Sequence, residues 1–195
     1  MKEILYEESA KIQNEKSAAT KYYVLKVLSI ISYTLAVLWF MFVFIFYNLV
    51  PGSVLLNIIF IVVPLAMFIA SGIVLGKFKN KFYVDYDYIF VSGSIRFSKV
   101  IKNVSRKFIC KFECSTIEKI GKIGSGTFEK YSNMPDVKRH ILTMNSYPAE
   151  GKDFYYIVAN FDSEKKLFVL ECTETFMVNV LKFSNKMVLE EDYKK

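Results

Sequence analysis

The strongest constraint on this chain is a run of fifty residues, 27–76, that contains no Asp, Glu, Lys, Arg or His. A membrane-spanning helix needs about 20 apolar residues to cross a hydrocarbon core of about 30 Å, so the run can hold two helices and a turn. Pro51 and Gly52 favour a turn near its middle, because proline lacks an N–H and glycine tolerates positive φ. We therefore predict a transmembrane hairpin over residues 23–76. Its expected parts are helices at about 23–47 and 54–75, joined by an external turn at 48–53.

Two other interpretations of this run fit less well. A pair of buried helices in a soluble core would need more additional sequence than a 195-residue chain offers to cover fifty apolar residues. A cleaved signal peptide is disfavoured, because residues 1–22 carry four glutamates and two apolar segments follow them. The sequence predicts an integral membrane protein with two spans.

Lysines on both sides of the run predict its orientation. They are Lys16, Lys21 and Lys26 before the first helix, and Lys77, Lys79 and Lys81 after the second. Positively charged flanks are retained on the cytoplasmic side, so both termini are predicted to be cytoplasmic in a multi-pass protein of the cell membrane. Residues 1–22 are then a cytoplasmic N-terminal segment. The three cysteines agree, since they lack the spacings of a secreted disulfide framework.

The predicted spans contain no ionisable side chain, which disfavours a pump or an ion-coupled transporter. Gly72 and Gly76 lie four residues apart on the second helix, a spacing that lets another helix approach closely. We expect this pair to contribute to helix–helix packing, and it is a candidate face for self-association.

The apolar residues change to a period of two after residue 77. In residues 82–90, for example, Tyr86 and Tyr88 alternate with Asp85 and Asp87, which is the spacing of a half-buried strand. Similar segments follow: "SIRFSKVI", "SRKFICKFEC", "TIEKI", "HILTMNS", "DFYYIVANF" and "KKLFVLEC". Residues 121–139 read as a long connection, because they contain three glycines and a proline.

The final segment, "TETFMVNVLKFSNK", has helical spacing, with Thr173 placed as an N-cap. Residues 77–195 are therefore predicted to form a cytoplasmic, mainly antiparallel β domain of six or seven strands. One C-terminal helix at about 174–186 closes it.

This order of elements resembles the PH-like fold. The chain is similar, over about residues 10–188, to an uncharacterised family of small bacterial membrane proteins in which two transmembrane helices lead into a cytoplasmic PH-like domain. The resemblance is carried by "YVDYDYIFVSGSIRF", "RKFICKFECSTIEKI" and "LFVLECTETFMVNVLKFSNKMV". It implies architecture, and no catalytic, ligand or cofactor residue is carried over from it.

Asp85 and Asp87 form an Asp-x-Asp pair. In glycosyltransferases such a pair holds a divalent cation where a strand ends in a turn, within alternating βα units. Here the pair lies inside a strand with period two and without that alternation, which favours a solvated acidic strand face. The alternative hypothesis is a membrane-bound enzyme that uses this pair as a metal site, with a lipid or nucleotide-sugar substrate.

Three other patterns are interpreted as structural. "GKIGSG" at 121–126 matches neither the dinucleotide nor the phosphate-loop pattern and is predicted to be a flexible loop. His140 has no clear nucleophile partner, while Cys110 and Cys114 alternate with phenylalanines as small core residues. We predict no catalytic, cofactor-binding or metal-binding residue.

Basic residues are concentrated in residues 77–111, which contain nine lysines and arginines and two acidic residues, both aspartates. Anionic lipid attracts each such residue by about 1 kcal/mol near a membrane surface. The candidates for this contact are Lys77, Lys79, Lys81, Lys99 and Lys102. The predicted function is a non-enzymatic binding or scaffolding module at the inner membrane surface. Its expected partners are anionic headgroups, an unidentified protein or a second copy, and not nucleic acid, since no helix carries a basic stripe.

Overall fold

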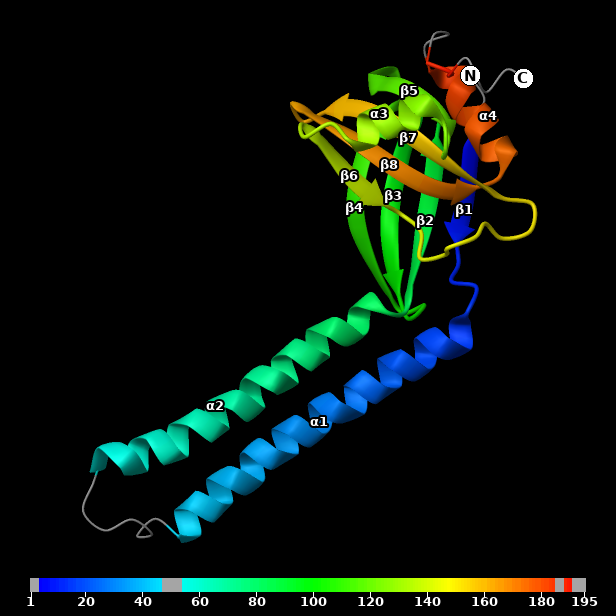
Figure 1. Ribbon diagram of the computed structural model, residues 1–195. Coiled ribbons are helices and arrows are strands. Elements are labelled where there is room, and N and C mark those ends of the chain that lie inside the picture. Colours follow the sequence, from blue (N-terminus) through cyan, green and yellow to red (C-terminus); the bar gives the residue numbers. More distant parts are fainter. Residues whose placement is uncertain (1–3, 47–53, 185–187, 191–195) are drawn as a thin grey trace. The chain divides into compact units, whose positions relative to one another are not determined.

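The computed structural model describes residues 4–46, 54–184 and 188–190 (Figure 1). The predicted external turn at 48–53 lies outside these residues, as do Tyr47 and residues 185–186, the expected ends of two helices. The chain divides into two compact units. Residues 14–83 form a helical unit, and residues 1–13 together with 84–195 form a β unit.

The helical unit consists of α1 (Glu15–Ile45), α2 (Val54–Phe78) and the short 3-10 helix η1 (Lys79–Lys81). Both long helices are long and apolar enough to cross a membrane. Only 11% and 6% of their most apolar windows are buried, whereas the core helix of a soluble protein is mostly buried. Helix α1 begins at Glu15, earlier than the predicted Tyr23, because the side chain of Asn14 caps it by accepting from Ser17 N at 3.1 Å.

The β unit contains two four-stranded sheets. Sheet A has the order β1-β2-β3-β4, formed by Leu5–Ala10, Val84–Val91, Ser94–Ile101 and Ser105–Glu113. Sheet B has the order β5-β7-β8-β6, formed by Ile117–Lys122, Asp153–Phe161, Glu164–Cys172 and Val137–Ile141. All pairs are antiparallel except β6 with β8. The predicted mainly antiparallel β domain is confirmed, with seven strands among the described residues after residue 77.

Strand β1 was not predicted. It pairs with β2 along its whole length, from Leu5 opposite Val91 to Ala10 opposite Tyr86. The sequence "LYEESA" is short and holds two glutamates, so it lacks the apolar alternation that identifies a strand. Since β1 and β2 are neighbours in one sheet, the whole helical unit is inserted between two adjacent strands of the β unit.

The core of the β unit lies between the two sheets and beneath the C-terminal helix α4 (Glu174–Phe183). Phe176, Met177 and Val180 of α4 are fully buried, as their helical spacing predicted. The Thr173 side chain accepts from Phe176 N, which confirms the predicted N-cap. Helix α4, in orange in Figure 1, packs on sheet A, where the Phe176 ring lies 6.0 Å from the rings of Tyr6 and Tyr88.

Two connections differ from the predictions. The long connection over 121–139 contains the helix α3 (Gly126–Ser132), whose N-cap Ser125 accepts from Phe128 N at 3.1 Å. A helix of seven residues is too short to show a clear apolar period. Strand β6 occupies Val137–Ile141, earlier than the predicted "HILTMNS", because Thr143 and Asn145 bind polar partners instead of pairing in a strand.

Candidate functional site

One end of sheet A receives both connections to the helical unit. Strand β1 runs toward it and continues to Gln13, while β2 starts from it at Val84. The register places Ile101 opposite both Val84 and Ser105, so the β3–β4 turn lies at the same end. We call this end the hairpin-side rim. It comprises residues 11–13, the turn 102–104 and, as shown next, the loop 143–149.

Hydrogen bonds bring the loop 143–149 to this rim. Asn145 donates its side-chain N–H to Lys11 O at 2.8 Å and accepts from Gln13 N at 2.9 Å. Gln13 in turn donates its side-chain amide to Tyr147 O at 2.8 Å. These bonds hold the loop against the last residues of the β unit before α1.

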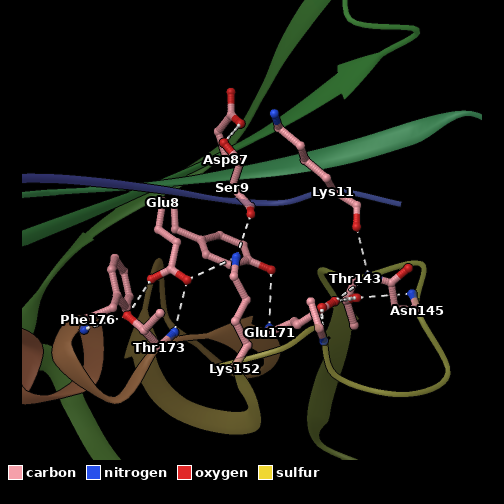
Figure 2. Close-up of polar contacts among 12 residues, drawn as sticks. Glu8, Ser9, Lys11, Asp87, Thr143, Asn145, Lys152, Glu171, Thr173 and Phe176 are labelled. Atoms are coloured by element: carbon pink, nitrogen blue, oxygen red, sulfur yellow. Dashed lines mark hydrogen bonds and ion pairs between the residues drawn. The ribbon is translucent and has the colours of Figure 1, made fainter. Parts of the chain in front are cut away.

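Figure 2 shows a second set of polar contacts, centred on Glu8 of β1. The Glu8 carboxylate is buried and accepts from Thr173 N and Thr173 Oγ1, at 2.9 and 3.0 Å. It also forms an ion pair with Lys152 Nζ at 3.0 Å, and Lys152 donates to Ser9 O at 2.7 Å. Glu8 therefore joins β1 to the start of α4 and to the residue before β7.

Glu171 of β8 is the second buried carboxylate in Figure 2, and it is fully covered. It accepts from Thr143 Oγ1 at 2.6 Å, Asn145 Nδ2 at 2.7 Å and Ala149 N at 2.9 Å. Tyr88 donates to Leu142 O at 2.5 Å and accepts from Glu171 N at 3.3 Å. Burial raises the pKa of the Tyr88 hydroxyl well above its usual value. Sequence reasoning missed both glutamates, because β1 with Glu8 was not predicted and the single acid in the predicted strand with Glu171 gives no signal of burial.

The Asp85 and Asp87 side chains do not form the predicted solvated face. They are 5% and 4% exposed, so that prediction is wrong. Asp87 accepts from Ser9 Oγ at 2.7 Å and pairs with Arg106 at 2.8 Å, while Asp85 accepts from Ile12 N at 2.8 Å. The cover comes from the unpredicted strand β1, the residues after it, and β4, which a local pattern in β2 cannot reveal.

Both aspartates line a small cavity of about 220 Å³ on this face, together with Ser9, Lys11, Val100, Asn103 and Arg106. The lining thus contains two carboxylates and two cationic side chains, and the contacts of Asp87 with Ser9 and Arg106 tie three strands together. Among the residues that the structure describes, no group of three or more His, Cys, Asp or Glu side chains could hold a metal ion.

The five candidate lysines fall in both units. Lys77 lies in the last turn of α2, Lys79 and Lys81 lie in η1, and Lys99 and Lys102 belong to the β unit. Lys102 is in the turn of the rim, with φ 52°. Lys99 of β3 lies directly opposite Lys107 of β4, which concentrates positive charge near the rim.

Gly72 and Gly76 lie against α1 within the helical unit. Gly72 O accepts from Ser29 Oγ at 2.8 Å, and a Cβ at Gly72 would come within 2.8 Å of the Tyr33 ring. A Cβ at Gly76 would lie 3.4 Å from Ser29 Oγ. The absence of side chains at these glycines lets the two helices approach. Self-association through this pair stays a prediction.

The remaining candidate groups lie within the packing of the β unit. Burial raises the pKa of Cys110 to about 11 and that of Cys114 to about 12, which keeps both thiols protonated at neutral pH. The His140 ring stacks on Phe168 with centroids 5.3 Å apart. Burial, together with the charges of Lys166 and Lys138, lowers the pKa of His140.

The loop 121–126 also differs from its prediction. Its last residues start α3, and Gly121 packs against the described C-terminal residues. A Cβ at Gly121 would overlap the Glu190 carboxylate and lie 2.7 Å from the Tyr156 ring. The glycine is therefore required by close packing.

The chain has no match among curated proteins or among solved structures. One family model, described as the bacterial PH-like domain (DUF6106), matches residues 5–190. That range begins with β1 and ends with the last described residues, so it includes both sheets and the inserted helices. The resemblance found in the sequence is thus confirmed, and the chain belongs to this family of bacterial PH-like domains.

Proposed function

We propose that this protein is a membrane-anchored, non-enzymatic binding module whose PH-like domain acts at the anionic inner surface of the bilayer. The observation that carries the proposal is the insertion of the helical unit between β1 and β2. A domain anchored at one terminus has one covalent link to its membrane helices, whereas this domain has two. Both links leave from the hairpin-side rim, which is therefore the part of the β unit tethered closest to the bilayer.

Charge supports the choice of partner. Lys102 lies in the rim turn, and Lys99 and Lys107 form a cross-strand pair close to it. In the helical unit, Lys77, Lys79 and Lys81 follow the apolar part of α2. Tethering raises the local concentration of these cations at the headgroups, and no enclosed lipid pocket is needed for such contact. Their cytoplasmic placement follows from the same lysines.

The non-enzymatic part of the proposal rests on the aspartates. An Asp-x-Asp metal site needs carboxylate oxygens that can turn toward a cation. Here Asp87 is engaged by Ser9 and Arg106, and Asp85 by the backbone of Ile12. These contacts join β1, β2 and β4, which supports a structural role for the pair.

The test compares lysine reactivity in the full-length protein, reconstituted in nanodiscs of phosphatidylcholine alone or with added phosphatidylglycerol. An amine-acetylating reagent is applied briefly, and mass spectrometry gives the rate at each lysine. We expect Lys99 and Lys102 to react several-fold more slowly in the anionic discs at low salt. The difference should vanish at high salt, because screening shortens the range of the attraction.

Lys182 serves as the matched control. It is exposed, and its neighbour Phe183 packs on Phe90 and Gly93 beside the β2–β3 turn, at the opposite end of sheet A. Its rate should not depend on the lipid. Equal rates at Lys99 and Lys102 in both lipids would overturn the lipid contact.

A further inference from the structure

Two apolar side chains stand out on the surface of the β unit. Val104 is 84% exposed and Tyr147 is 77% exposed, which makes them the most exposed large hydrophobic residues in the part of the β unit that the structure describes. A single exposed apolar residue is ordinary on a protein surface. The position of these two residues is what connects them.

Both residues lie on the hairpin-side rim. Val104 ends the β3–β4 turn, and its N–H donates to Ile101 O at 3.1 Å. The backbone O of Tyr147 accepts from the side chain of Gln13, which lies two residues before α1 begins. They come from different sheets and different turns, yet each is placed next to a point where the chain passes to the membrane helices.

Their chemistry suits the interface between headgroups and acyl chains. Tyrosine is enriched at that depth, because its ring is apolar while its hydroxyl remains hydrated. In the β3–β4 turn, Val104 provides an apolar side chain, and the nearby Lys102 provides a cation that can bind lipid phosphate. The same rim in water would leave both apolar surfaces hydrated, which is unfavourable relative to burial in lipid.

We propose that Val104 and Tyr147 form a two-point contact with the interfacial layer of the bilayer that holds the hairpin. This contact fixes the rim on the membrane and gives the β unit a defined tilt. The proposal rests on the proposed function, since it requires the β unit to act at an anionic bilayer surface. It adds the two residues that enter the lipid and the depth that they reach.

The test uses tryptophan fluorescence in the full-length protein. Trp39 of α1 is the only tryptophan, so a W39F background allows one new tryptophan at a time. The variants V104W and Y147W are reconstituted in anionic vesicles with and without brominated acyl chains, which quench tryptophan at short range. We expect both to lose intensity with brominated lipid and to emit at shorter wavelength than an exposed tryptophan.

The control is L5W in the same background. Leu5 is 69% exposed, and it lies opposite Val91 at the far end of sheet A, about 16 Å along β1 from Ala10. It should not be quenched. The wild-type protein, with Trp39 in α1, is the positive control for reconstitution.

The outcomes separate the two proposals. If Lys99 and Lys102 are protected by anionic lipid while V104W and Y147W are quenched no more than L5W, the two-point contact is overturned and the surface contact stands. If neither effect is seen, both fail. Should tryptophan perturb either turn, V104C and Y147C carrying an environment-sensitive dye give the same comparison with L5C.

Discussion

At the scale of single residues, the β unit depends on carboxylates that sequence patterns place on the surface. Glu8 is the clearest case, because the side chain of its neighbour Glu7 is half-exposed and, among the described residues, pairs with Arg106 at a long 3.8 Å. Two adjacent glutamates in one strand thus have opposite surroundings. Alternation of the strand explains the difference, since successive side chains point to opposite faces.

Replacement of Glu8 by alanine should destabilise the β unit by about 2 to 3 kcal/mol. The change removes the ion-pair partner of Lys152, whose side chain is only 18% exposed. It also removes the carboxylate oxygen that accepts from Thr173 N. Hydrogen exchange measured by mass spectrometry on the full-length protein should show faster exchange in β1 and in the first turn of α4. Glu7→Ala is the matched control and should change exchange very little, because an exposed pair contributes about 0 to 1 kcal/mol. Equal effects of the two changes would contradict the assignment of Glu8 as the anchor of β1.

At the scale of elements, most of the β unit could be predicted from sequence because its central strands alternate. The segments "DFYYIVANF" and "KKLFVLEC" became β7 and β8, and the turn between them has positive φ at both Asp162 and Ser163, as in type I′ hairpins. Helix α4 was equally clear from its apolar spacing and its threonine cap.

The elements that were missed share a physical cause. Strand β1, helix α3 through Phe128, and the burial of Asp85 and Asp87 all depend on partners far away in the sequence. Short elements carry little periodic signal, and tertiary contacts decide their structure. The candidate site was predictable only as a cluster of lysines. The rim itself follows from the register of β1, and no local pattern contains that information.

The described C-terminal residues form another such element. Ile120 N donates to Val188 O at 2.9 Å, and Glu190 N donates to Ile120 O at 3.0 Å, so residues 188–190 extend sheet B next to β5. Glu190 is buried and accepts from the Tyr156 hydroxyl at 3.1 Å. Burial and the charge of Glu190 both raise the pKa of Tyr156.

Gly121→Ala should detach residues 188–190 from β5. The new methyl group would overlap the Glu190 carboxylate, and overpacking of this kind costs about 1 to 3 kcal/mol. Hydrogen exchange at the amide of Glu190 should rise by about tenfold to a hundredfold, at 1.4 kcal/mol for each factor of ten. Gly126→Ala is the control, because a Cβ there meets nothing within 4 Å. The double change Gly121→Ala with Glu190→Ala should lower the free energy of unfolding by less than the sum of the two single changes. If the two effects simply add, the clash between the new methyl group and Glu190 is contradicted.

At the scale of the whole molecule, the orientation of the hairpin can be tested with single cysteine probes. We expect a membrane-impermeant maleimide to label Ser53→Cys in intact cells and to leave Leu5→Cys unlabelled until the membrane is opened. Leu5 suits the second probe, because it is 69% exposed. The native thiols interfere little, since burial raises the pKa values of Cys110, Cys114 and Cys172 and so suppresses the reactive thiolate. Labelling of Leu5→Cys in sealed cells would overturn the predicted cytoplasmic termini.

The position of the hairpin also determines how the β unit can be separated from the membrane. A fragment that starts at residue 77 lacks β1, so it exposes the edge of β2 and leaves Lys152 without Glu8. An unpaired strand edge promotes aggregation. Removal of residues 14–83 keeps every strand, and the remaining ends are close, because Ala10 lies opposite Tyr86 in an antiparallel pair.

We therefore predict that residues 1–13 joined to 84–195 by a short Asn-Gly-containing turn fold as a soluble, monomeric β domain. Such a turn suits the junction, since type I′ turns connect adjacent antiparallel strands and favour Asn-Gly. Size-exclusion chromatography and the dispersion of amide proton signals in NMR spectra would measure folding directly. The fragment 77–195 is the matched comparison, and it should aggregate or show poor dispersion. Adding Glu8→Ala to the joined chain should reduce its thermal stability, as predicted above for the full-length protein. A well-folded 77–195 fragment would show that the β domain folds without β1. The helical unit would then precede the domain, and would not be inserted between two strands that the domain needs.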